Sequence, residues 1–103
     1  VGISVGFDSH QYDLLLGLRL SANSFYNVGK MISANFKNVF ATLEGGYNIE
    51  IFPRCLYNFL DGINGNKMRF EERNTDSMIQ IFYEYEGRKA LAMQLLKKYW
   101  KSI

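Results

Sequence analysis

Two short apolar runs, separated by an amphipathic segment, constrain the fold of this chain more than any other feature. The runs cover Val1 to Gly6 and Asn38 to Leu43, and both are rich in aliphatic or aromatic residues. Continuous apolar runs of this length are typical of strands in a parallel sheet whose two faces are both covered by helices. We therefore predict a buried strand at each run.

The segment between the two runs has the pattern of a helix. Ser21 is a suitable N-cap, and apolar residues then recur at spacings of three and four, at Phe25, Val28, Met31, Ile32 and Phe36. A strand, a crossover helix and a second strand form a parallel strand–helix–strand unit, which predicts an α/β fold. Two strands alone make a poor sheet, and the chain begins with Val1 rather than Met. We therefore expect further strands from an upstream part of the same protein.

The second half of the chain is predicted to be helical. A helix is expected over Ile51 to Leu60, and the stretch "DGINGNK" then breaks the pattern. Helical sequence resumes from Thr75 to Trp100, where Asn74 or Thr75 could cap the helix. Gly87 is expected to divide this region into two helices, the second with an apolar stripe at Leu91, Leu95 and Tyr99.

Composition excludes some classes of function. Cys55 is the only cysteine, so the chain has no internal disulfide and a reducing, cytoplasmic location is expected. A net charge of +2 is too small to indicate nucleic-acid binding. No apolar run reaches the roughly 18 residues of a membrane span. Three lysines near the end, Lys97, Lys98 and Lys101, are interpreted as a solvated helix end, with a partner-binding patch as the alternative.

Polar residues follow each predicted strand at its carboxyl end, where ligands bind in parallel α/β sheets. "GFDSHQYD" follows the first strand and "EGGYN" follows the second. Asp8 and Tyr47 should therefore lie at the same sheet edge. A carboxylate there suits a metal ion or a cationic substrate, and a tyrosine suits a developing oxyanion. Gly45 and Gly46 would let the backbone approach a substrate. On the pattern alone, turn or cap chemistry remains the alternative.

These two stretches resemble motifs of a known family. "GFDSHQYDLLLGLRLS" is similar to the signature G-F-D-x-H-x-x-D-P-L-G-G-L-x-L-T of the histone deacetylase superfamily, which includes acetylpolyamine amidohydrolases and acetoin-utilisation proteins. "LEGGYNIE" resembles the L-E-G-G-Y-N-L motif of the same family, and the resemblance covers roughly Ile3 to Gly65. It implies a larger parallel-sheet, three-layer arginase/deacetylase-like fold, of whose catalytic domain residues 1–103 would form the C-terminal part.

The resemblance also implies residue roles. Asp8 matches a zinc ligand, Tyr47 matches the catalytic tyrosine, and Gly45 and Gly46 match glycines that line the substrate tunnel. The remaining Zn²⁺ ligands and the paired catalytic histidines would lie upstream. The implied activity is zinc-dependent removal of acetyl groups from an acetylated lysine peptide or an acetylated polyamine, in a prokaryotic enzyme. A non-catalytic interaction or scaffold domain that keeps the fold is the alternative.

Other residues near the motifs have weaker interpretations. His10 and Asp13 are expected to be structural or to lie behind the metal ligand, and Phe7 either lines the tunnel or packs. Glu44 is expected to bond the backbone or loop. The thiol of Cys55 should be buried and inert, and the aromatic group Phe82, Tyr83 and Tyr85 should lie in the core or at an interface. Leu14 and Leu16 replace the Pro and Gly of the family signature, which leaves the path of that loop open.

Overall fold

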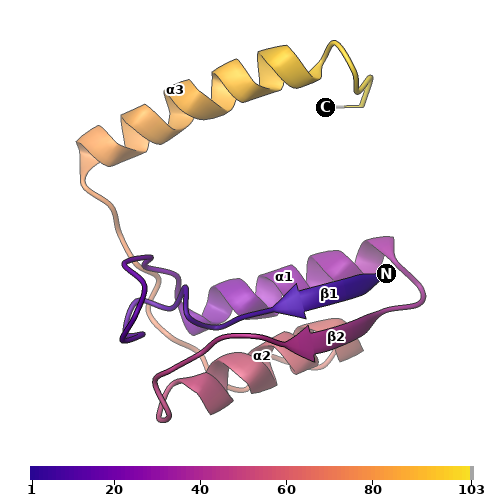
Figure 1. Cartoon of the computed structure of the whole chain (residues 1–103), viewed down its shortest axis with the longest axis vertical. Coiled ribbons are helices and arrows are strands. Elements are labelled where there is room, and N and C mark those ends of the chain that lie inside the picture. The colour runs from indigo at the N-terminus through magenta and orange to yellow at the C-terminus, as the bar shows by residue number, and fades with distance from the viewer. Residues whose placement is uncertain (103) are drawn as a thin grey trace.

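The computed structural model describes residues 1–102 and confirms the strand–helix–strand unit (Figure 1). The two strands pair in parallel, with Gly2 opposite Phe40 and Val5 opposite Leu43. A parallel pair requires a crossover, and the first helix supplies it. The elements in chain order are β1 (Gly2–Val5), α1 (Ala22–Asn35), β2 (Phe40–Leu43), α2 (Phe52–Asn64) and α3 (Ile79–Leu96).

Helix α1 begins directly after Ser21, as predicted, but its cap has a different origin. The backbone of Ser21 is extended, and its side chain makes no capping hydrogen bond. Instead the first backbone N–H of the helix, at Ala22, donates to Oε2 of Glu72 at 2.6 Å. A carboxylate at this end of a helix satisfies a free N–H group and complements the helix dipole. The start of α1 is thus stabilised by a residue 50 positions away.

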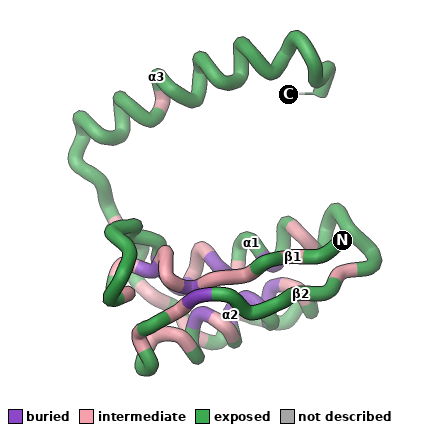
Figure 2. Tube along the Cα trace, in the orientation of Figure 1, coloured by how far each residue is buried: buried purple, intermediate pink, exposed green. Residues whose placement is uncertain are grey.

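The core lies where the sheet meets α1 and α2 (Figure 2). The ring of Phe7 is its centre and makes edge-to-face contacts with Phe25, Phe52 and Phe59, at centroid distances of 5.1, 5.6 and 6.2 Å. Such contacts add stability beyond the buried area. Cys55 completes the buried set with a fully enclosed thiol.

The two helices α1 and α2 approach each other closely at a pair of glycines. A Cβ atom on Gly29 would collide with the backbone oxygen of Phe59, and a Cβ atom on Gly62 would collide with that of Tyr26. The absence of these side chains lets the two helix backbones approach. The predicted apolar stripe of α1 is only partly buried: Phe25 is in the core, whereas Val28, Met31 and Phe36 are exposed.

The sheet is covered on one face only within residues 1–102, whereas the sequence predicted helices on both faces. Ile3 and Val5 pack against the core, and α1 and α2 lie on that same side of the strands (Figure 1). Alternate residues face the other way, and the side chain of Phe40 there is 68% exposed. Strand β2 has no buried residue. The prediction of buried strands is wrong for this part of the chain, because both helices pack on each other on one side.

Helix α3 is one continuous helix, so the predicted division at Gly87 is wrong. A Cβ atom on Gly87 would meet nothing within 4 Å, and an exposed helical glycine costs only about 1 kcal/mol. Within the described residues, α3 contacts none of the other helices or strands and buries no side chain (Figure 2). Its predicted stripe and its aromatic residues, Phe82, Tyr83 and Tyr85, are therefore exposed rather than in the core.

The predicted caps of this last helix are also wrong, because Asn74 and Thr75 bond elsewhere. The Thr75 hydroxyl donates to the backbone oxygen of Arg19 at 2.6 Å, and Oδ1 of Asn74 accepts from the side chain of Asn23 at 3.1 Å. These bonds hold the segment before α3 against the loop after β1 and the first turn of α1, and the helix begins only after Met78. No helix in the described part of the chain is long and apolar enough to cross a membrane.

Candidate functional site

The loops that follow β1 and β2 lie side by side at the carboxyl edge of the sheet, as the sequence predicted. The backbone N–H of Glu44 donates to the oxygen of Val5 at 2.8 Å. The backbone N–H of Phe7 then donates to the oxygen of Gly45, also at 2.8 Å. The two bonds extend the strand pairing beyond the last strand residues, so the parallel register brings the two motifs together.

Asp8 and Gly45 are in direct contact at this edge. A Cβ atom on Gly45 would lie 2.6 Å from Oδ2 of Asp8, well inside van der Waals contact. Only glycine therefore leaves room for the carboxylate in this position. Within residues 1–102 the structure records no hydrogen bond to the Asp8 carboxylate, whose oxygens lie against Gly45.

Gly46 has a backbone φ of 136°, a conformation that side chains with a Cβ rarely adopt. A Cβ atom there would also meet the ring of Phe52 at 2.8 Å and Cβ of Phe7 at 3.2 Å. The glycine pair thus carries the chain from the end of β2 to Tyr47 in a conformation that a larger residue would not adopt easily. The structure shows a steric requirement for both glycines, and their predicted place in a substrate tunnel stays a prediction.

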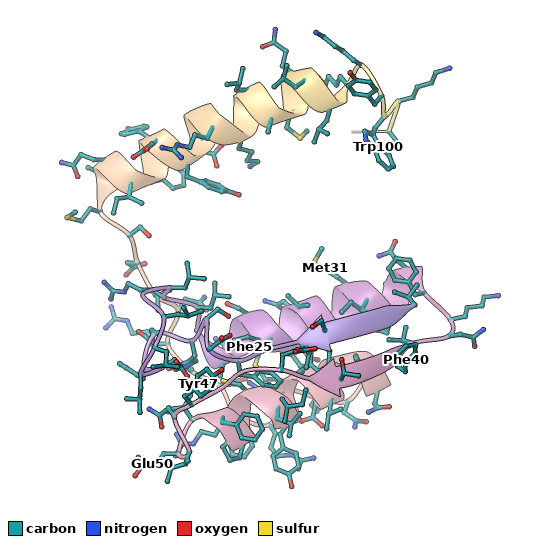
Figure 3. All side chains as sticks on the ribbon, in the orientation of Figure 1. Phe25, Met31, Phe40, Tyr47, Glu50 and Trp100 are labelled. Carbon is teal, nitrogen blue, oxygen red and sulfur yellow. The ribbon has the colours of Figure 1, made fainter. Side chains whose placement is uncertain are left out.

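Tyr47 lies in the loop beyond β2, and its side chain is 50% exposed (Figure 3). Its backbone N–H donates to Oδ2 of Asp13 at 2.8 Å. Oδ1 of the same carboxylate accepts from the backbone N–H of Leu15 at 2.9 Å. Burial works to raise the pKa of Asp13, but the bonds from Leu15 and Tyr47, with further backbone groups, lower it below its ordinary value. Asp13 therefore joins the two motif loops as a carboxylate.

His10 is buried and bonded on both ring nitrogens. Nδ1 accepts from the backbone N–H of Tyr12 at 3.1 Å, so the ring proton of the neutral form is on Nε2 and is donated to Glu72 Oε2, 2.9 Å away. Gln11 donates to the other oxygen of Glu72 at 2.9 Å. His10 is thus held in a structural network, in agreement with the structural alternative considered from sequence.

Glu72 is the residue that sequence reasoning missed. Burial works to raise its pKa, but the bond from Ala22, the bond and charge of His10 and the bond from Gln11 lower it below the ordinary value. Its neighbours are 49 to 62 positions away in sequence, and no local pattern marks it. Ser21 satisfied the sequence rule for a cap, so the need for a distant acceptor is visible only in the structure, where the Ser21 side chain makes no capping bond.

A cavity of about 290 Å³ opens beside this network rather than beside the motif residues. Asp8, Gly45, Gly46 and Tyr47 do not line it. Its lining mixes two arginines, two glutamates and apolar or aromatic groups, and consists of His10, Tyr12, Ala22, Ile51, Arg54, Arg69, Phe70, Glu71 and Glu72. The charges of the arginines and glutamates balance, so the cavity favours neither anions nor cations.

Three remaining candidates have structural positions. The ring of Phe7 is 1% exposed in the core, which is the packing alternative. Burial, together with the charge of Glu72, raises the pKa of Cys55 to about 12, so its thiol is inert as expected. Oε1 of Glu44 accepts from the Thr42 hydroxyl at 3.4 Å, a local bond at the strand end.

The chain presents one candidate metal ligand at the sheet edge, not a complete set. Among residues 1–102 no three His, Cys, Asp or Glu side chains gather closely enough to hold a metal ion. A zinc site needs three or four protein ligands. The carboxylate of Asp8 fits one of them, and the others would have to come from outside this chain.

Comparison with known proteins agrees with this geometry. The fold and site define a class of protein: α/β proteins with a carboxylate and a tyrosine at the carboxyl edge of a parallel sheet. The histone deacetylase domain family matches residues 1–63, which include both motif loops, and the chain belongs to that family. It is 29% identical over 86 residues to a probable deacetylase of Methanothermobacter thermautotrophicus. No solved structure matches it.

The match to this relative covers 84% of the chain but only 26% of the relative. The chain therefore spans about a quarter of the length of the curated relative. The family membership establishes a deacetylase-type domain, and the parallel strand–helix–strand unit is consistent with a part of that fold.

Proposed function

We propose that this chain supplies one part of the active site of a zinc-dependent amidohydrolase that removes acetyl groups from acetyl-lysine or from acetylated polyamines. The observation that carries the proposal is the contact between the two motif loops, in which Gly45 makes room for the carboxylate of Asp8. Family membership supports a deacetylase reaction. The similarity to the probable deacetylase of Methanothermobacter thermautotrophicus supports the same reaction.

Each motif residue has a role in this proposal. Asp8 holds the zinc ion as one ligand of a set completed by other parts of the protein. Bound zinc polarises an amide carbonyl and activates water near neutral pH. The phenol of Tyr47 donates a hydrogen bond to the oxygen on which negative charge develops, a contribution of roughly 3–4 kcal/mol to the barrier. Gly45 and Gly46 have no side chains, so they leave room for the substrate to reach both Asp8 and Tyr47.

Asp8→Ala in the complete protein tests the metal role. The variant is expected to lose bound zinc, because it removes one of few ligands. Metal analysis after gel filtration measures this, and Asp76→Asn, an exposed acidic residue near the start of α3, is the matched control. Full zinc occupancy in Asp8→Ala would exclude Asp8 as a ligand. Zinc bound but no acetate released by the unaltered protein would favour the alternative, a non-catalytic domain that keeps the fold.

A further inference from the structure

Asp13 has an unusual position among the acidic residues of the chain, because its two oxygens bond different loops. Oδ1 accepts from the N–H of Leu15, two residues on, which closes a turn within its own loop. Oδ2 accepts from the N–H of Tyr47, 34 residues away. The carboxylate is thus fixed by the first motif loop and holds the second.

Within residues 1–102, the bond that the Tyr47 backbone N–H donates to Asp13 is the only hydrogen bond of Tyr47. The residue before it, Gly46, has a backbone φ of 136° and no side chain that could make contacts of its own. The segment before Tyr47 forms no hydrogen-bonded turn that would fix its backbone. The direction in which the phenol leaves the backbone depends on where its N–H is anchored.

A second bond reinforces the same junction from the other side of Tyr47. The side-chain N–H of Asn48 donates to the backbone oxygen of Tyr12 at 2.7 Å. Oδ1 of Asn48 accepts from the N–H groups of Glu50 and Ile51, at 3.1 and 3.3 Å, in the turn that leads into α2. The loop that carries Tyr47 is thus tied to the first motif loop at residue 13 and again at residue 12.

We infer that Asp13 is a positioning residue for Tyr47, holding its backbone so that the phenol points at the reacting carbonyl. The inference rests on the proposed function, since it concerns the same site. It differs from a role behind the metal ligand, because Asp13 acts on the tyrosine and not on Asp8. A catalytic group displaced by about 1 Å can lose roughly 100-fold in rate.

A double-mutant cycle on the complete protein tests this, with Asp13→Asn, Tyr47→Phe and the combination. Asn keeps the shape of Asp, but its amide nitrogen cannot accept one of the two N–H groups. We expect Asp13→Asn to lower kcat for acetate release by about 10- to 100-fold, with KM and zinc content unchanged. In the Tyr47→Phe background the same change should have almost no effect, because the group that it positions is gone.

The possible outcomes separate the inference from the proposed function. If Tyr47→Phe leaves kcat unchanged, the catalytic role of Tyr47 fails, and the inference fails with it. If Tyr47→Phe lowers kcat but Asp13→Asn does not, or lowers it equally in both backgrounds, the proposed function stands and the inference is overturned. Loss of zinc in Asp13→Asn would likewise overturn it in favour of a role at the metal. Should Asp13→Asn fold poorly, Asp13→Glu, which keeps both acceptors on a longer side chain, carries the same cycle.

Discussion

At the scale of single residues, the site depends on a glycine, Gly45, whose lack of a side chain leaves room for Asp8. Gly45 lies against Asp8 so closely that any Cβ atom would displace the carboxylate. A substitution at Gly45 therefore moves the Asp8 carboxylate while leaving Asp8 itself unchanged. This makes Gly45 a sensitive probe of whether the position of Asp8 matters for metal binding.

Gly45→Ala is expected to weaken zinc binding in the complete protein by about 10- to 100-fold, the range seen when groups that orient metal ligands are changed. The added methyl group would lie 2.6 Å from Oδ2 of Asp8, so the carboxylate must move. Competition with a chelating dye measures the affinity. Gly87→Ala is the matched control, because a Cβ atom there meets nothing within 4 Å. Equal zinc affinity in both variants would show that the contact does not position the ligand.

Glu72 allows a prediction of pH dependence. Its pKa in the folded chain lies below the ordinary value of 4.5, so in acid the unfolded state takes up its proton first. The stabilisation that Glu72 gives is present above about pH 4.5 and is lost as the pH falls through the lower folded value. Glu72→Gln cannot titrate. We expect its melting temperature to be below that of the unaltered protein at neutral pH, and this difference to shrink in acid. A difference that stays constant down to about pH 3 would contradict the assignment.

The positions of residues that directly follow a strand were predictable from sequence. The hydrogen bonds between residues far apart in the chain were not. Asp8, Gly45 and Tyr47 follow two strands of matching direction, and this placed them at one edge. The acceptor role of Glu72 and the second bond of Asp13 depend on partners that are 34 to 62 positions away. No periodicity or turn pattern encodes such pairs, because they form only when the loops are folded together.

At the scale of elements, the glycines of α1 and α2 set how the two helices cross. Gly29 and Gly62 each face the backbone of the other helix, and neither has room for a methyl group. The strand β1 rests on these helices through Ile3 and Val5. The distance between the helices therefore affects the support of the strand end that leads to the site.

Gly62→Ala is expected to lower the free energy of unfolding by roughly 1–3 kcal/mol, the usual effect of overpacking. Alanine favours a helix more than glycine does, so any loss must come from the collision with the backbone oxygen of Tyr26. Urea denaturation followed by circular dichroism measures the change. Gly87→Ala, also within a helix but exposed, should cause no loss. If Gly62→Ala is as stable as that control, the close crossing of α1 and α2 is not a constraint.

The start of α1, the two strands and the existence of α2 followed from apolar periodicity and turn residues. The predicted break at Gly87 failed because glycine weakens an exposed helix without ending it. The caps at Asn74 and Thr75 failed because Asn74 bonds to Asn23 in α1 and Thr75 bonds to Arg19 in the loop after β1. Local sequence preference thus described elements well where no competing tertiary contact was present.

At the scale of the whole molecule, a large part of the apolar surface is not covered within residues 1–102. The sheet has one open face, with Phe40 on it, and α3 carries exposed aromatic and aliphatic residues without contacting the other elements. The sequence predicted helices on both sheet faces from the apolar strands, whereas in the described residues only one face is covered.

The central claim is that the two motif loops form one catalytic edge, and zinc-dependent acetate release tests it most directly. The complete protein would be offered an acetyl-lysine peptide and an acetylated polyamine, with and without a chelator, beside its Tyr47→Phe variant. We predict release that the chelator abolishes and that Tyr47→Phe lowers by about 100- to 1,000-fold, the typical effect of losing an oxyanion donor. Release that persists unchanged in Tyr47→Phe, or that does not depend on the metal, would contradict the account.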